Sequence, residues 1–187
     1  MASVPRTPSE FFLDFVPGAF SAPAGVTSNF AVSFEVTGAG VFSLRLRGGK
    51  LEAEPGLASD VLLRVSLSPE AFDGIVLPMA ERAVSTVAAE PELMAVKALT
   101  LDADRERLLR ETRGTMVLSA SSGTVEHRMS VSAGDTTGAS QCEVSCSLDD
   151  LWALQSGQAN PIELLMNGKI RITGDAQLAL SLSAVLG

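Results

Sequence analysis

From Ser145 to Leu186 the sequence reads "SCSLDDLWALQSGQANPIELLMNGKIRITGDAQLALSLSAVL". This stretch contains the clearest signals in the sequence for where helices start and turns lie. Ser147 stands before Asp149 and Asp150, as an N-cap and first-turn acids do at the start of a helix. After Arg171 the chain carries a single acid and no basic residue, so it ends on a strongly apolar segment. Such a segment needs a partner beneath it, either an ordinary core or a space for an apolar guest.

Segments with alternating apolar and polar residues precede this stretch and predict strands of a sheet. In the second half they are Gly114–Ser121, Thr124–Gly134 and Ser140–Ser147. In the first half they are Phe30–Val36, Val41–Arg47 and Asp60–Ser68. The last of these leads into a helix with Ser68 as N-cap and Pro69 at its first position, and Pro78 is expected to interrupt that helix.

The two halves share short stretches of similar sequence. "RVSLSPEAF" (Arg64–Phe72) is similar to "EVSCSLDDL" (Glu143–Leu151), and "ELMAVKALTLDAD" (Glu92–Asp104) is similar to "LLMNGKIRITGDA" (Leu164–Ala176). We therefore expect a diverged internal duplication. The predicted organisation is an N-terminal helix and linker, a first half and a second half, with one compact unit as the alternative: residues 1–28, 29–112 and 113–187.

The N-terminal helix is predicted from a capping box, "TPSE" at residues 7–10, with proline at the first helical position. One face of this helix carries apolar residues, and Pro17-Gly18 is expected to end it. Those residues are Phe11, Phe12, Phe15 and Val16. They are expected to cap a core; the alternative is a lip for an apolar ligand or a brief membrane contact.

The second half resembles the sterol-carrier-protein family, the non-specific lipid-transfer domain. The family's pattern is a strand meander, a capped helix, a short helix with a proline, a strand between two glycine turns and an apolar C-terminal helix. Here Gly157 and Pro161 match the glycine and proline of the short helix, and Gly168-Lys169 and Gly174-Asp175 match the two turns. The resemblance covers residues 114–187, whereas the first half matches only in its strands and helix start.

The resemblance implies an α+β fold in which a curved mixed or antiparallel sheet carries helices on one face, with a hydrophobic tunnel between them. It implies binding or transfer of fatty acyl chains, sterols or phospholipids without catalysis and without a cofactor. It also implies a C-terminal helix capped by Asp175, although the alternation of leucines after it indicates a strand. The expected ligand-binding residues are Leu151, Trp152, Leu154, Ile162, Leu165, Met166, Ile170, Ile172, Leu178 and Leu182.

The first half departs from this pattern at "DADRERLLRETRG" (Asp102–Gly114), which is mostly charged where the second half is apolar. A charged segment cannot line an apolar tunnel, so the second half is expected to hold the ligand and the first to serve as scaffold. The alternative function is a structural or protein-interaction module that kept the fold without an open tunnel. A homodimer or a protein partner would then cover the apolar tail.

Charge and composition exclude several classes of function. A net charge of −8 and a pI near 4.6 argue against nucleic acid as a partner and against stable residence on an anionic membrane. No run approaches the roughly 18 apolar residues that a membrane span requires. Cys142 and Cys146 lie on one strand face, roughly 13 Å apart, which is too far for a disulfide. A cytoplasmic location is expected.

The sequence shows no arrangement of residues typical of an enzyme. His127 is the only histidine, and nucleophile-elbow, phosphate-loop and zinc-protease motifs are absent. Two cysteines without a second cysteine or histidine pair are too few for a zinc site. We therefore expect no catalytic residue, no metal and no cofactor. Trp152 is expected to belong to the core, with the wall of a tunnel as the alternative.

Overall fold

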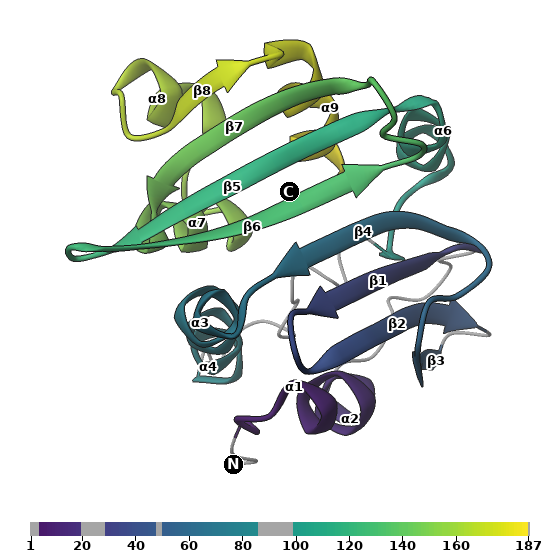
Figure 1. Cartoon of the computed structure of the whole chain (residues 1–187). Coiled ribbons are helices and arrows are strands. Elements are labelled where there is room, and N and C mark those ends of the chain that lie inside the picture. The colour runs from purple at the N-terminus through teal and green to yellow at the C-terminus, as the bar shows by residue number, and fades with distance from the viewer. Residues whose placement is uncertain (1–3, 20–28, 48–49, 86–98, 187) are drawn as a thin grey trace.

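The computed structural model describes residues 4–19, 29–47, 50–85 and 99–186. These residues form one mixed sheet with the strand order β3-β2-β1-β4-β6-β5-β7-β8 (Figure 1). The strands are β1 (Ala31–Val36), β2 (Gly40–Arg47), β3 (Lys50–Pro55), β4 (Val61–Leu67), β5 (Gly114–Ser122), β6 (Val125–Ala133), β7 (Ser140–Ser147) and β8 (Arg171–Gly174). The predicted α+β class with a mixed sheet is confirmed.

The same strand arrangement occurs in each half of the chain. β1 and β2 form an antiparallel hairpin, and β4 then pairs parallel to β1. β5 and β6 likewise form an antiparallel hairpin, and β7 pairs parallel to β5. The two units join where β4 pairs antiparallel with β6, so the sheet is continuous across the halves. This arrangement agrees with an internal duplication, which itself stays a prediction.

Strand β3 was not predicted from the sequence. It pairs antiparallel with β2 at the outer edge of the sheet. Its sequence, "KLEAEP", consists largely of residues that are poor in strands, so tertiary pairing rather than local propensity decides its conformation. Of the segments proposed as repeated, residues 92–98 lie outside the described part of the chain.

One face of the sheet is apolar from the first half into the second. Phe34 pairs with Phe42 on β2 and with Val65 on β4, and Val65 pairs with Val131 on β6. Val131 in turn pairs with Met116 on β5. Successive side chains of a strand point to opposite faces, so the alternate positions form a second face that is rich in serine. These serines include Ser33, Ser43, Ser66, Ser119, Ser130 and Ser132.

The helices cover the apolar face, as predicted. The N-terminal helix contacts β2 and β3, α7 and α9 contact β5 and β7, and α6 lies beside α9 (Figure 1). The helical segments are α1 (Pro8–Glu10), η1 (Phe11–Phe15), α2 (Val16–Ala19), α3 (Pro69–Ala71), η2 (Phe72–Val76), α4 (Leu77–Ser85), α6 (Ala103–Glu111), α7 (Leu148–Gln155), α8 (Pro161–Met166) and α9 (Ala176–Leu186). Here η marks a π-helical segment.

The prediction that Pro78 interrupts the second helix was wrong, whereas the first helix is described as far as Ala19, one residue past its predicted end at Pro17-Gly18. Both helices include their prolines, and in each a π-helical segment ends two residues before the proline. The Val16 N–H donates to the Phe11 carbonyl, and the Leu77 N–H donates to the Phe72 carbonyl, five residues back. The wider π turn accommodates a proline, which lacks an N–H and would clash in a regular α turn.

The N-terminal helix packs its aromatic face into the core. Phe12 stacks on Phe34 and Phe42 with centroid distances of 4.7 and 5.4 Å, and Phe11 meets Phe72 edge to face at 5.4 Å. The Thr7 hydroxyl accepts from the Glu10 N–H at 3.4 Å, which confirms Thr7 as the N-cap, and it donates to the Glu10 carboxylate at 2.8 Å in place of the backbone bond that a full capping box has. All four apolar residues singled out on this helix are buried, so the core interpretation is confirmed over a lip for a ligand.

The apolar tail forms α9, which confirms the helix rather than a strand. Asp175 is its N-cap, because its carboxylate accepts from the Leu178 N–H at 3.0 Å. Leu178 and Leu182 are buried while Leu180 between them is exposed, as the four-residue spacing of a helix face requires. The charged segment of the first half forms α6, capped by Asp102, and packs beside α9.

Candidate functional site

The apolar face is covered less completely in the second half than in the first. In the first half the apolar-face side chains of β1, β2 and β4, among them Val32, Phe34, Leu44 and Leu63, are buried beneath the helices. In the second half, Val144 on β7 and its cross-strand partner Ile172 on β8 are only half-buried. The outer part of the apolar face, at β7 and β8, therefore keeps solvent-accessible apolar surface.

The structure divides the predicted ligand-binding residues into three groups by burial. Leu151, Ile170, Leu178 and Leu182 are buried in the core. Trp152, Leu154 and Ile172 are half-buried and pack against that core. Ile162, Leu165 and Met166 are exposed and lie outside it. The first two groups belong to one apolar cluster, whereas the third group faces away from it, on α8.

The start of α9 is fixed tightly against the sheet. A Cβ at Gly114 would lie 2.6 Å from the Leu178 Cδ2 atom, so Leu178 occupies the space that a side chain on β5 would need. A Cβ at Gly174, where φ is +88°, would lie 2.5 Å from the Gln141 carbonyl oxygen. The Asp175 N–H donates to that same carbonyl at 3.0 Å. Leu178 therefore behaves as a core-packing residue at this site.

Helix α8 is also firmly held, although it is short. The Asn160 side chain accepts from the Ile162 N–H at 2.8 Å, and Pro161 occupies the first helical position. Leu164 points into the core, and its carbonyl accepts from the Lys169 N–H at 2.9 Å. The local geometry thus agrees with the short proline-containing helix and the following turn that the sequence predicts.

Sequence reasoning missed two accessible apolar side chains close to the predicted set. Val144 lies on the apolar face of β7 and is half-buried, and Leu180 on α9 is 57% exposed. Alternation along β7 identifies Val144 as an apolar-face residue but gives no measure of its burial. The exposure of Leu180 follows from the helical spacing of Leu178 and Leu182, once α9 is known to be a helix.

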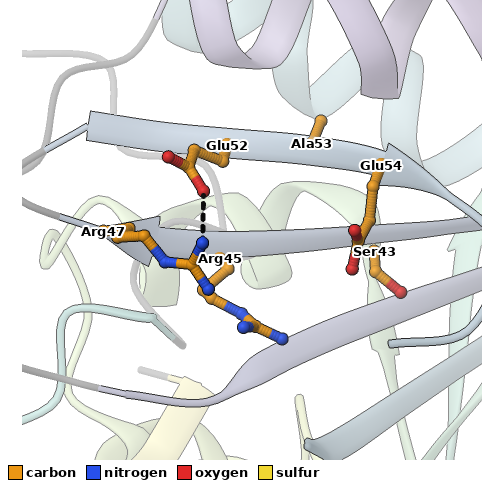
Figure 2. Close-up of a pocket in the computed structure, with 6 residues that line it drawn as sticks. All are labelled: Ser43, Arg45, Arg47, Glu52, Ala53 and Glu54. Atoms are coloured by element: carbon orange, nitrogen blue, oxygen red, sulfur yellow. Dashed lines mark ion pairs between the residues drawn. The ribbon is translucent and has the colours of Figure 1, made fainter. Parts of the chain in front are cut away.

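A separate pocket of about 300 Å³ lies at β2 and β3 (Figure 2). Its lining is largely charged: Ser43, Arg45, Arg47, Glu52, Ala53 and Glu54. The Arg47 and Glu52 side chains lie 3.6 Å apart, and Arg45 forms an ion pair with Asp60. This pocket was not predicted, and its charged lining is unsuited to an acyl chain or a sterol.

The two thiols are buried and unreactive in character. Burial raises the pKa of Cys146 to about 11, with a smaller contribution from Asp150, and burial also raises the pKa of Cys142. Both cysteines are therefore protonated at neutral pH, as small core residues are expected to be. The prediction that they are buried apolar residues is confirmed.

The polar face of the second half carries an ion-pair cluster between β6, β5 and β7. Arg128 pairs with Glu143 and donates to the Ser119 hydroxyl at 2.9 Å, and Ser119 donates to Glu143 at 3.0 Å. These hydrogen bonds hold the pKa of Glu143 below its ordinary value. Each polar group thus has a partner, which is typical of a structural cluster.

Metal-ligand groups and membrane-spanning helices are both absent from the described residues. They hold no group of three or more His, Cys, Asp or Glu side chains that could bind a metal ion. Nor does the described part of the chain contain a helix long and apolar enough to cross a membrane. His127 is half-buried on β6, and its ring lies directly over Gly74 of η2.

Comparison with known proteins gives one family match and several structural similarities. The model of the SCP-2 sterol transfer family matches residues 85–187. Sterol carrier protein 2 like 2 from Aedes aegypti is 18% identical, covers 62% of this chain and 96% of its own, and gives a TM-score of 0.36. Sterol carrier protein domain 2 of Helicoverpa armigera is 24% identical to this chain. The similarity covers 50% of this chain and 81% of that one, with a TM-score of 0.37.

Sterol carrier protein 2 from Yarrowia lipolytica, in its apo form, is 17% identical to this chain. The similarity covers 42% of this chain and 76% of that one, with a TM-score of 0.34. A search of curated protein sequences finds no match.

Proposed function

Because this chain belongs to the SCP-2 sterol transfer family, we propose that its second half binds and transfers an apolar lipid. The lipid class is a fatty acyl chain, a sterol or a phospholipid, held in a hydrophobic tunnel between the closing helices and the sheet. The proposed activity is non-catalytic and needs no cofactor. The protonated thiols and the fully partnered Arg128–Glu143 pair support this view, since neither offers an activated nucleophile or base.

The observation that carries the proposal is the uneven burial of the apolar face. Trp152 and Leu154 on α7, and Ile172 on β8, pack against the core yet remain half-accessible. Apolar atoms that touch the core and still reach solvent are positioned to cover part of a lipid. The first half, closed by its phenylalanine cluster, has the character of a scaffold.

In this proposal the seven predicted ligand-binding residues that belong to the apolar cluster have two roles. Trp152, Leu154 and Ile172 contact the lipid directly. Leu151, Ile170, Leu178 and Leu182 lie behind them and set the shape of the cavity. This second group is buried in the described structure, so lipid entry requires α7 or α9 to shift outward from the sheet.

The energetics suit a long hydrocarbon and give little selectivity. Each buried methylene contributes about 0.8 kcal/mol. Roughly eight to ten methylenes would offset much of the cost of association, which is about 4–15 kcal/mol. Apolar pockets distinguish single methylenes poorly, so several related lipids should bind with similar affinity.

We place this activity in the cytoplasm. The support is chemical: both cysteines are free, and their buried thiols suit a reducing compartment. The alternative function, an interaction module without an open tunnel, is favoured by the close packing of Leu178 against Gly114. A binding measurement separates the two.

The experiment uses Trp152 as an internal reporter. The chain contains one tryptophan and no tyrosine, so the intrinsic fluorescence excited at about 295 nm comes from Trp152 alone. Titration with the fluorescent fatty acid cis-parinaric acid should give saturable energy transfer from Trp152, reversed by added oleic acid. Saturation without energy transfer would place the lipid elsewhere. The absence of any saturable binding would favour the interaction module.

A further inference from the structure

Helix α8 presents a solvent-exposed apolar side that the lipid site does not use. Ile162, Leu165 and Met166 are 66%, 44% and 82% exposed. A helical step of about 100° per residue places these three within roughly a third of the helix circumference. Leu164 lies on the opposite side and is buried, so the exposed side points away from the core. Glu163 lies at its flank.

This exposure belongs to a well-anchored helix. The N-terminus is capped by Asn160, and the C-terminus is closed by the Lys169 N–H and the Ile170 N–H, which donate to the Leu164 carbonyl at 2.9 and 3.2 Å. Leu164 on α8 and Ile170 after the turn that follows α8 are both buried, and they fix the helix to the core. The three apolar side chains are therefore held outward by the fold.

Basic side chains follow this apolar side directly. Lys169 and Arg171 are the only basic residues in the sequence after Arg128, and both come within five residues of Met166. The Lys169 side chain lies 3.6 Å from Asp150 but is 57% exposed, and Arg171 on β8 is exposed. Two basic side chains thus follow the exposed apolar residues closely in the sequence, and Glu163 is the one acid on α8.

We propose that α8 is the element through which the protein docks on a phospholipid bilayer while it exchanges lipid. Ile162, Leu165 and Met166 enter the boundary between headgroups and acyl chains, and Lys169 and Arg171 lie against lipid phosphates. This inference rests on the proposed lipid-transfer function. To that function it adds the place where the protein contacts the membrane. The chain leads from α8 directly to Ile170 and Ile172 of the proposed lipid site, so the docked helix borders that site.

A bilayer fits this surface better than a second copy of the chain. A stable protein interface buries about 800 Å² per partner, which three partly exposed side chains on a six-residue helix do not provide. Shallow insertion of apolar side chains beside basic residues is how interfacial helices bind membranes. The overall negative charge keeps the rest of the molecule away from anionic lipid, so the contact is expected to be brief.

The test is flotation with vesicles of phosphatidylcholine, alone and in an equal mixture with phosphatidylserine. The variant Ile162→Ser/Met166→Ser should reduce vesicle affinity by about tenfold or more. Leu180→Ser is the matched control, because Leu180 is 57% exposed but lies on α9, and its effect should be small. Lys169→Gln/Arg171→Gln should weaken binding to the mixed vesicles and leave phosphatidylcholine binding unchanged. Thermal melts establish that each variant is folded.

Several results would overturn the docking role. One is equal flotation of the wild type and Ile162→Ser/Met166→Ser, and another is the absence of wild-type flotation. A third is a concentration-dependent dimer that the same variant dissociates, since a second copy would then occupy this side of α8. The wild-type titration with cis-parinaric acid, done without vesicles, reports on lipid binding separately. Flotation that depends on α8, without probe binding, would refute the proposed lipid carriage while still showing that α8 contacts the bilayer.

Discussion

At the scale of single residues, burial decides which apolar side chains can act on a ligand. Leu178 and Trp152 were equally good candidates by composition, because a core and the wall of a lipid cavity use the same residue types. The structure separates them: Leu178 fills the space above Gly114, whereas Trp152 is half-buried. That difference depends on how α9 and α7 meet the sheet, which no local sequence pattern encodes.

Leu178→Ala is expected to destabilise the fold by about 2–4 kcal/mol, because it leaves a cavity in a close-packed site. Gly114→Ala should also destabilise it, since the added Cβ would lie 2.6 Å from Leu178 Cδ2 and φ at Gly114 is +152°. Urea denaturation measures both effects. Leu178→Ala in the Gly114→Ala background should cost less than in the wild type; strict additivity would show that the two residues do not compete for the same space.

The buried thiol of Cys146 predicts a loss of stability in alkaline solution. Its pKa is raised from 9.0 to about 11 in the folded protein, mainly by burial. The associated stability is fully present below pH 9 and is lost as pH rises through about 11, because the unfolded chain then ionises more readily. Comparing the free energy of unfolding of wild type and Cys146→Ala between these pH values isolates this contribution. An identical pH dependence in both proteins would show that Cys146 does not contribute.

At the scale of elements, much of the second half could be predicted from the sequence. The caps at Ser147 and Asp175 are local signals, and both form the hydrogen bonds that a helix start needs. The first half was harder to predict. Proline is normally a helix breaker, but the π-helical segments before Pro17 and Pro78 let both helices continue. Those segments depend on tertiary packing, which sequence periodicity does not reveal.

The π-helical segment η2 is expected to be coupled to β6 through one close contact. A Cβ at Gly74 would overlap the His127 ring, so Gly74→Ala should destabilise the fold by about 1–3 kcal/mol. In a His127→Ala background the same substitution should cost much less, because the space is vacated. A double-mutant cycle by urea denaturation measures this coupling. A coupling energy near zero would mean that the Gly74 helix does not rest on His127.

At the scale of the whole molecule, the halves share one sheet and one continuous core. β4 pairs with β6 over Leu63–Leu67 and Met129–Ala133, and the buried cluster extends from Phe11 to Leu182. The first half is filled by packed phenylalanines, and the second leaves accessible apolar surface at β7 and β8. A closely packed half joined to a more accessible half is a suitable arrangement for a lipid carrier, and we propose that the region around α7 and α9 opens to admit the lipid.

One cooperative unfolding transition follows from this shared core. Trp152 emission reports on the second half, and far-ultraviolet circular dichroism reports on both halves. The two signals should give coincident urea midpoints. Separate midpoints would show that the halves fold independently, in agreement with distinct domains rather than one compact unit.

The central claim, that this protein carries an apolar lipid, is tested most directly by native mass spectrometry of the purified protein followed by organic extraction. The account predicts a species heavier than the bare chain by the mass of one lipid, and recovery of that lipid from the extract. A protein that has only the mass of the bare chain, both as purified and after incubation with oleic acid and with cholesterol, would contradict it.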